Sequence, residues 1–283
     1  MRHIVLAATL LLAAGCGSST VMDAPAVDHP YDGPLDAPLS YEDDADVMKR
    51  SGAAGLALEC TGTPTNGGGA DYDSGLASTQ GSPEGAVDNW MEEDGADFGG
   101  LPREGYRLER EGEGRVLYSY DVGGSSKATV VVFSQVRDWQ GETGWGVESW
   151  AMCDPAEFPA ALTDEMGIEI WQDGAGHRVS TGRISSYPGA EHCDWQDIRF
   201  ITLDFDTPRR RQFVRDVHGE FEHLRTTYDA SATLPPDATD TDLRHDGLHL
   251  WLASDGSAAY LVNEADPTDV ERWPRARQPI YCA

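Results

Sequence analysis

The four cysteines beyond residue 50 limit how this chain can fold more than any other feature of its sequence. They are Cys60, Cys153, Cys193 and Cys282. An even number of cysteines in an exported chain indicates two disulfides, and four cysteines can be paired in three ways. We favour pairing in sequence order, because each bond then closes one of two segments of similar length. The favoured bonds are Cys60–Cys153 and Cys193–Cys282. No Cys-x-x-Cys spacing is present, which argues against a structural zinc site.

The first sixteen residues indicate that the chain is exported. Met1 to His3 is a short basic segment, and the apolar run Ile4–Ala14 is interrupted only by Thr9. A membrane span needs about 20 apolar residues, so this run is too short to be one and has the length of a signal-peptide core. Small residues precede Cys16, as is typical of a cleavage site. We therefore expect a signal peptide over residues 1–15.

The residues at the expected cleavage point, Leu12-Ala13-Ala14-Gly15-Cys16, resemble the lipobox of bacterial lipoproteins. This resemblance implies cleavage after Gly15, attachment of lipid to Cys16, and anchoring at the extracytoplasmic face of the cell membrane. Ala13 departs from the family, which most often has leucine or another aliphatic residue there, and ordinary secretion is the alternative. Each buried CH₂ of an acyl chain contributes about 0.8 kcal/mol, so several chains would anchor the protein stably.

Residues 16–54 are expected to form an acidic tether. Proline recurs at positions 25, 30, 34 and 38, and residues 17–50 contain eight acidic residues against Lys49 and Arg50. A chain of this composition is extended and solvated. A capping-box pattern at Ser40 and Asp43 favours a short helix reaching to about Leu58, whereas glycines at 52 and 55 disfavour it.

Residues 55–159 are expected to form an α+β module. Ser82, Pro83 and Glu84 are typical of the start of a helix. The apolar residues that follow share one helical face: Ala86, Val87, Trp90 and Met91. Alternating or β-branched runs separated by glycine turns then predict strands over residues 106–110, 116–120, 128–133 and 146–152. The helix can cover one face of this antiparallel meander. The glycine-rich segment 62–75 is interpreted as loop.

Residues 160–283 are expected to form a second, mainly β module. Predicted strands cover residues 168–171, 179–184, 197–203, 248–252, 258–262 and 270–273, and turns at 173–176 and 254–256 favour hairpins. The apolar spacing between 211 and 224 fits a helix or a strand, and we favour a strand. Residues 235–242 are interpreted as loop. The predicted fold class is therefore α+β and β-rich: two small antiparallel-sheet modules, the first with a covering helix, each held by a disulfide.

Two segments, Ala151–Phe158 and Val270–Ala276, resemble parts of uncharacterised secreted lipoproteins of high-GC Gram-positive (actinobacterial) bacteria. The similarity extends over residues 55–283. Two lysines against nineteen arginines, with abundant alanine, glycine and aspartate, agree with a GC-rich source. The group has no assigned activity, so the resemblance implies no catalytic residue, cofactor or ligand.

The charge excludes some classes of partner. The chain has 49 acidic against 21 basic residues, a formal charge of −28. A nucleic-acid partner is not expected, because binding phosphates requires clustered lysine and arginine, and the densest basic run is Arg209–Arg211. The same imbalance argues against electrostatic adsorption to anionic lipid.

Motifs for catalysis and metal binding are weak. The chain has no Gly-x-Ser-x-Gly motif, Walker loop or dinucleotide fingerprint, so we assign no catalytic residue and no cofactor. His218 and His223 are five residues apart, which does not suit a zinc-binding helix. His245 and His249 have a four-residue spacing, but Gly247 interrupts it. We interpret these histidines as surface residues and assign no metal ligand.

The predicted function is that of a membrane-anchored extracytoplasmic lipoprotein that binds a protein or polymer of the cell envelope without catalysis. One alternative is a hydrolase of envelope polymers. Another is a carbohydrate- or calcium-binding module, because tryptophans at 139, 145 and 150 could stack on sugars. Acidic loops at 71–75 and 237–242 could supply calcium ligands.

Overall fold

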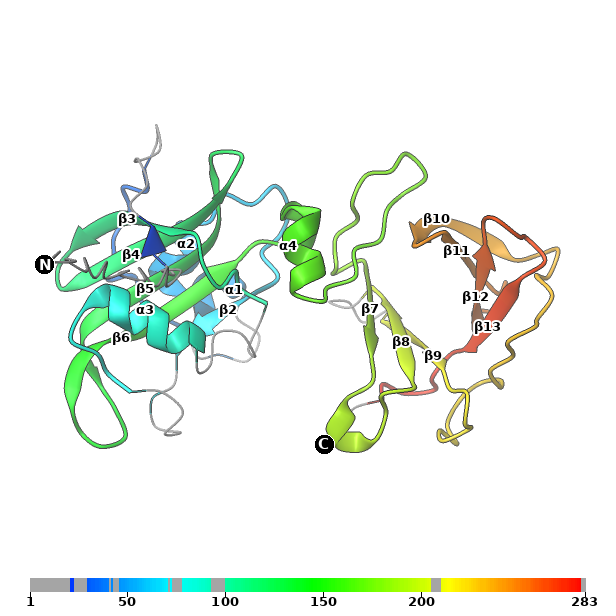
Figure 1. Cartoon of the computed structure of the whole chain (residues 1–283). Coiled ribbons are helices and arrows are strands. Elements are labelled where there is room, and N and C mark those ends of the chain that lie inside the picture. Colours follow the sequence, from blue (N-terminus) through cyan, green and yellow to red (C-terminus); the bar gives the residue numbers. More distant parts are fainter. Residues whose placement is uncertain are drawn as a thin grey trace, which may run out of the picture.

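The computed structural model describes residues 21–22, 30–40, 42, 46–70, 72, 78–92, 100–204 and 210–280. The expected signal peptide, Cys16 and Cys282 lie outside these ranges. The described chain is rich in strands and has separate, mainly antiparallel sheets, so the predicted α+β, β-rich class is confirmed. Figure 1 shows two sheet-containing modules with helix α4 (Ala160–Glu165) between them. Within the described residues, no helix has the length and apolar character that a membrane crossing requires.

A six-stranded sheet, in the order β1-β3-β4-β5-β6-β2, forms the framework of the first module. Strands β3 to β6 make the antiparallel meander that the sequence predicts, and each is longer than its predicted run. Strand β1 adds to β3 in parallel. The strands are β1 (Val21–Met22), β2 (Asn66–Gly69), β3 (Tyr106–Gly112), β4 (Arg115–Val122), β5 (Ser125–Arg137) and β6 (Thr143–Met152).

Helix α3 (Pro83–Trp90) covers one face of this sheet, as the sequence predicts. The Ser82 side chain accepts a hydrogen bond of 3.0 Å from the backbone N–H of Gly85, which caps the helix. The predicted apolar face is buried, and its members are Ala86, Val87, Trp90 and Met91. Trp90 packs against Trp150 of β6, with ring centroids 5.9 Å apart.

The opposite face of the sheet is covered by chain that the sequence analysis assigns to the tether. Residues 30–40 and the helices α1 (Val47–Arg50) and α2 (Gly52–Leu56) pack there. Their buried members are Leu35, Val47, Ala53 and Ala54, and the sheet contributes Leu117, Val131 and Ala151. Apolar residues on β4 and β5 point to both faces of the sheet, so the second face needs a cover. The boundary expected at residues 54 and 55 therefore falls inside packed structure.

Polar contacts fasten this covering segment to β3. Glu109 accepts a hydrogen bond of 2.6 Å from the backbone N–H of Tyr31, and Arg110 donates one of 2.7 Å to the carbonyl oxygen of Gly33. The buried Arg107 forms ion pairs with Glu109 and Asp121. Residues 30–40, α1 and α2, which we call the strap, are therefore docked on the sheet and do not form a solvated tether, although they are acidic and rich in proline.

Strand β2 lies in the segment that the sequence analysis interprets as loop. Its residues pair with Ser149–Met152 of β6. A Cβ atom at Gly67 would lie 2.4 Å from Ser51 Oγ and 2.8 Å from the Trp150 carbonyl oxygen. Glycine is needed because the chain around α1 and α2 lies directly over the edge of the sheet. At Gly68, by contrast, a Cβ atom would have no neighbour within 4 Å.

The expected Cys60–Cys153 disulfide is present and joins the segment after α2 to the end of β6. It connects residues 93 positions apart, and closing a loop of that length stabilises a fold by about 4 kcal/mol in the chain-entropy description. Cys193 is also disulfide-bonded. Cys282, the partner that we favour for it, lies outside the described residues.

The two modules are joined by a hydrogen-bonded junction directly after Cys153. The Asp154 side chain accepts hydrogen bonds from the Ser180 hydroxyl at 2.6 Å and from the backbone N–H of Thr181 at 3.0 Å. Arg178 reaches back to the carbonyl oxygen of Ala156 at 3.1 Å and to the Thr163 hydroxyl of α4 at 3.0 Å. These bonds hold residues 178–181 of the second module against the end of the first.

Two sheets packed face to face form the second module (Figure 1). One contains β7 (Ile184–Pro188), β8 (Arg199–Leu203) and β9 (Arg211–Arg215). The other contains β10 (Thr239–His245), β11 (Leu248–Leu252), β12 (Ala258–Asn263) and β13 (Val270–Pro274). The predicted β11–β12 hairpin and the strands at β8 and β13 are confirmed. The strand favoured between 211 and 224 forms over Arg211–Arg215.

Only the turn end of the hairpin predicted from residues 168–171 and 179–184 forms. The turn at 173–176 closes on a single bridge between Gln172 and Arg178 and on a hydrogen bond of 2.8 Å from the backbone N–H of Val179 to the carbonyl oxygen of Trp171. The chain beyond Val179 is instead held by the junction at Asp154, and Ile184 begins β7, which pairs with β8. A tertiary hydrogen-bond network therefore prevails over local strand propensity.

The loop predicted over residues 235–242 is wrong at its C-terminal end, where β10 begins at Thr239. A shift in register between Asp240 and Leu243 marks a β-bulge, and Asp242 has a positive φ of 60°. The bulge adds one residue to the strand, so Leu243 does not fall in the simple alternation of inward and outward side chains. The sequence pattern that would identify a strand is therefore interrupted.

We expect Gly67→Ala to lower the free energy of unfolding by about 1–3 kcal/mol, because the added methyl group must displace backbone atoms of β6. Urea denaturation followed by tryptophan fluorescence measures this change. Gly68→Ala in the same strand is the matched control and should have a much smaller effect. Equal effects of the two substitutions would contradict the packing described for α1, α2 and β2.

Candidate functional site

The second module opens at one end into a cavity between its two sheets, which we call the mouth. The mouth has a volume of about 340 Å³, which is within the range of small-ligand pockets. Its floor is the apolar core of the module and includes Trp171, Ile201, Leu261 and Trp273. Its walls carry polar and charged side chains, namely Glu169, Ser186, Arg199, Arg215, His245 and Glu271.

Strand alternation explains why charged groups gather there. Every second residue of a strand points to the same face, so Arg199 shares the inner face of β8 with Ile201. Arg215 likewise follows the buried Phe213 on β9, and Glu271 precedes the buried Trp273 on β13. The inner face of the module is therefore apolar at depth and charged at the mouth.

Glu169 is the centre of one polar network in the mouth. It pairs with Arg199 and accepts a hydrogen bond from the Ser186 hydroxyl. The indole N–H of Trp171 donates to Ser186 Oγ at 2.9 Å. Burial by itself would raise the pKa of Glu169, but the Ser186 hydroxyl and the Arg199 guanidinium outweigh it, and the pKa is lowered. Glu169 is therefore ionised at neutral pH.

A second ion pair lies on the same end of the module. Arg215 Nε is 3.3 Å from Glu271 Oε2, which also accepts a hydrogen bond of 2.8 Å from the indole N–H of Trp273. Arg215 and Arg199 are directly opposite each other on β9 and β8. Like charges in that position repel, and each arginine has its own carboxylate to offset the repulsion.

His245 completes the wall formed by the four-stranded sheet. Its Nε2 atom lies 3.8 Å from Glu169 Oε2 and 3.5 Å from Asp246 Oδ2. Its Nδ1 atom lies 3.3 Å from the carbonyl oxygen of Ile170, and its ring centroid is 5.6 Å from that of Trp171. The imidazole is thus oriented by backbone and ring contacts, with one nitrogen facing two carboxylates.

A larger cavity of about 610 Å³ adjoins the mouth and shares Glu169, His245 and Asp246 with it. We call it the side cavity. It is bounded by α4 on one side and by Arg178, Arg244 and Glu264 on others. The side cavity therefore lies where the junction between the modules meets the β10–β11 turn.

Two features of the groups of the mouth bear on the hydrolase alternative. In a catalytic triad the histidine takes the proton of the serine, whereas Ser186 here donates its hydrogen bond to Glu169. A glycosidase needs a carboxyl group with a raised pKa as its general acid. Each described carboxyl group whose pKa departs from its ordinary value is shifted downward.

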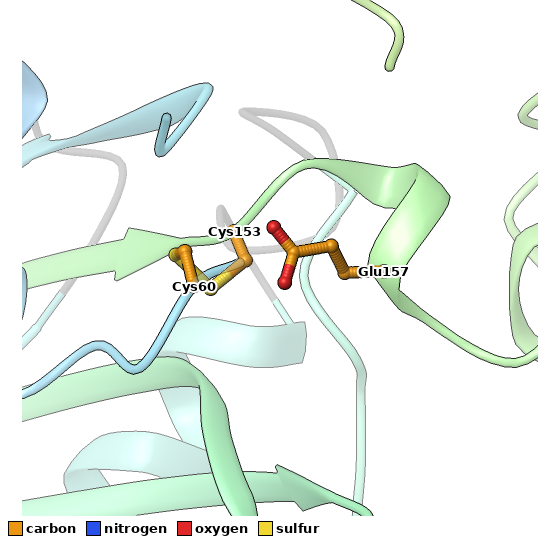
Figure 2. A group of neighbouring side chains, drawn as sticks. All are labelled: Cys60, Cys153 and Glu157. Carbon is orange, nitrogen blue, oxygen red and sulfur yellow. A yellow bond between two sulfur atoms is a disulfide. The ribbon is translucent and has the colours of Figure 1, made fainter. Parts of the chain in front are cut away.

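Cys60, Cys153 and Glu157 form a cluster that has the spacing of a metal site, with ligand atoms within 4.8 Å of one another. Figure 2 shows the Glu157 carboxylate directed toward the disulfide. The sulfur atoms are bonded to each other, so they cannot act as thiolate ligands. Glu157 accepts hydrogen bonds from Lys127 Nζ and the backbone N–H of Thr61, each at 2.7 Å. This cluster therefore fastens the disulfide loop to the junction.

The histidines considered from the sequence do not converge. His249 Nε2 lies 2.6 Å from Asp240, whereas His245 faces the mouth. His218 lies 3.7 Å from Asp197. In the acidic segment at 237–242, Asp242 pairs with Arg244, so its carboxylate and that of Asp240 are directed to different partners. In the other acidic segment, 71–75, Asp71 and residues 73–75 lie outside the described residues.

The three tryptophans considered as a sugar-binding surface have different environments. Trp139 is 57% exposed at the tip of the β5–β6 hairpin. Trp150 is buried against Trp90, and Trp145 packs partly against the same core. These three side chains therefore do not form one stacking surface.

Sequence reasoning did not identify the residues of the mouth. A usable signal is a charged residue two positions from an apolar core residue within one strand. This pattern occurs at Arg199 and Ile201 on β8, at Phe213 and Arg215 on β9, and at Glu271 and Trp273 on β13. Glu169 and Trp171 have the same spacing in a segment that is not a strand. This signal can be used only when the buried face of each strand is known, and a single amino-acid sequence does not give that information.

Comparisons with protein-family models, with curated proteins and with solved structures found no significant match.

Glu169→Gln tests the network in the mouth. The folded chain holds the pKa of Glu169 below its ordinary value of 4.5, so the resulting stability is fully present above about pH 4.5. It is lost as the pH falls through the lowered pKa. We therefore expect the free energy of unfolding of the natural chain to exceed that of the variant at neutral pH, with a gap that narrows on acidification. Urea titrations between pH 7 and 3 measure the gap.

The control for this experiment is Glu222→Gln, which changes an exposed glutamate of the same module. Its effect should be small at every pH. A gap between the natural chain and Glu169→Gln that does not change with pH would contradict the network.

Proposed function

We propose that this protein is a lipid-anchored, extracytoplasmic binding protein of the cell envelope, which holds a small polar ligand in the mouth of its second module. The observation that carries this proposal is the charged lining of the mouth. Two ion pairs, Arg199–Glu169 and Arg215–Glu271, occupy inward-facing positions where the rest of the module has apolar side chains.

The energetics of these ion pairs support a role in binding. Removing charged groups from water costs several kcal/mol for each ion in a low-dielectric site, and apolar residues of similar volume often stabilise a fold as well or better. The four side chains of these pairs are 22–41% exposed and so are only partly removed from water, and charged groups in such a cavity are candidates for a functional site. The mouth combines such groups with an apolar floor, as ligand pockets do.

A binding role is favoured over the hydrolase alternative by the chemistry of the same groups. The lowered pKa of Glu169 keeps this carboxylate ionised, so it suits hydrogen bonding to a ligand and not donation of a proton. The Ser186 hydroxyl is directed to a carboxylate and not to a histidine. Both features favour recognition of polar groups without catalysis.

The position of the anchor is compatible with this role. The lipobox resemblance places the lipid on Cys16, and β1 begins at Val21. Five residues span at most about 18 Å, so the first module would lie close to the membrane. The mouth belongs to the second module, which lies on the other side of α4 from the first module in Figure 1.

Binding in the mouth is tested by saturation-transfer NMR with the purified chain and a panel of small polar compounds: neutral disaccharides, dipeptides and sugar phosphates. We expect at least one compound to bind and Arg215→Gln to weaken its binding about tenfold, through loss of a charge-assisted hydrogen bond. The matched control is Arg183→Gln, which changes an exposed arginine just before β7. An affinity that Arg215→Gln leaves unchanged, or the absence of binding by any member of the panel, would contradict the proposal.

The anchor is tested separately with Cys16→Ser in cells that express the full chain. Without the thiol no lipid can be attached, so we expect the variant in the medium and the natural chain in the membrane fraction, as seen by immunoblotting. Labelling with a radioactive fatty acid should mark the natural chain and a Ser18→Ala control, but not Cys16→Ser. A variant that stays in the membrane would refute lipid anchoring at Cys16.

A further inference from the structure

We propose that the ligand of the mouth is a zwitterion, a molecule of about dipeptide size that carries one carboxylate and one ammonium group. This inference rests on the proposed function, because it names the ligand class of the same site. It is drawn from the way positive and negative side chains are divided between the two walls of the mouth.

The wall formed by the three-stranded sheet supplies the positive end. Arg199 and Arg215 are adjacent on β8 and β9, and their side chains are 41% and 33% exposed. The contacts to their partner carboxylates use Nη2 of Arg199 and Nε of Arg215. A guanidinium has five N–H donors, so each arginine retains donors that can bind a ligand carboxylate in a forked geometry.

The wall formed by the four-stranded sheet supplies the negative end. Asp246 lies in the β10–β11 turn and Asp269 directly before β13, and both line the mouth. The two turns are held together by a hydrogen bond of 2.8 Å from the backbone N–H of Glu264 to the carbonyl oxygen of Gly247. The side chain of Asp246 is exposed, and Asp269 accepts a hydrogen bond of 3.1 Å from the Asn263 amide. An ammonium group would find carboxylate oxygens here.

This division of charge selects among ligand classes. A simple anion would be attracted by two arginines but repelled by four carboxylates, those of Glu169, Glu271, Asp246 and Asp269. A simple cation would leave the arginine donors of the opposite wall without a ligand acceptor. A neutral sugar could bond to both walls but would gain no charge attraction from either. A zwitterion aligned across the mouth satisfies both walls at once.

The remaining lining sets the size of the ligand. Leu248, Leu261 and Trp273 lie between the two charged walls, where they can contact a short apolar group. The volume of about 340 Å³ suits a dipeptide. The side cavity begins at Asp246, so a longer chain attached beyond the ammonium end could extend into it.

The experiment is isothermal titration calorimetry of the full secreted chain, with its disulfides intact, against three forms of alanyl-alanine. These are the free dipeptide, the N-acetylated form and the C-terminal amide, each tested as the L,L and the D,D isomer. A neutral disaccharide is the comparison. We expect one free dipeptide to bind at least tenfold more tightly than its acetylated form, its amide and the disaccharide.

Two variants assign the ends of the ligand. Arg215→Gln should weaken binding of the free dipeptide to the level of the amide while leaving binding of the amide unchanged. Asp269→Asn should weaken binding of the free dipeptide to the level of the acetylated form, while leaving binding of the acetylated form unchanged. A merely structural role of either residue would weaken all forms alike. Arg183→Gln and Glu222→Gln are the controls with unchanged affinity, and thermal melting checks that each variant is folded.

Several results would overturn the inference. Equal binding of the free, acetylated and amidated dipeptides would show that the charges are not recognised. Failure of every free dipeptide to bind would also refute it. If the disaccharide alone binds and Arg215→Gln weakens that binding, the ligand is not a zwitterion, although the proposed function of the mouth stands. Binding of a free dipeptide that no mouth variant affects would contradict both.

Discussion

The carboxylate of Asp154 is the contact on which the arrangement of this protein depends. It lies one residue after the Cys60–Cys153 disulfide and is only 3% exposed. A buried carboxylate is tolerated only when hydrogen bonds replace its water, and Ser180, Thr181 and Ala156 supply them. The bonds to Ser180 and Thr181 hold this segment against the end of the first module, and Arg178 bonds to Thr163 of α4. The segment between α4 and Arg178 carries Glu169 and Trp171. It is thereby placed across the end of the second module, where it forms part of the mouth.

In the mouth, the same strands contribute both to the core and to the proposed binding site. The buried residues of β8, β9 and β13 hold the two sheets together through Ile201, Phe213 and Trp273. Two residues away on each strand, the same face carries Arg199, Arg215 and Glu271. Their charges are offset in pairs, Arg199 with Glu169 and Arg215 with Glu271, and the four side chains remain partly exposed to solvent.

Much of the first module can be predicted from local signals. Helix α3 has a serine cap, a proline at its first position and one apolar face, and the β3–β6 meander has glycine turns between alternating runs. The errors occur where distant chain segments meet. Residues 30–54 look solvated because they are acidic and rich in proline, but Leu35, Val47 and Ala54 cover the second face of the sheet. Strand β2 looks like loop because Gly67 must fit beneath Ser51. At residues 168–171 no strand forms: Glu169 bonds to Ser186 in the mouth, and only the turn end of the expected hairpin is closed.

The amino-acid sequence by itself determined the features that depend on neighbours along the chain: the strand-rich class, helix α3, the meander and the β11–β12 hairpin. Capping, turn formation and alternation act over a few residues, so their signals can be read from one chain. Only the tertiary structure decided the strap on the first module, the junction at Asp154 and the mouth. Each of these brings together groups far apart in sequence, such as Glu169 with Arg199 and Arg215 with Glu271. Their energies depend on which residues share a buried face, and that is decided only when the sheets have packed.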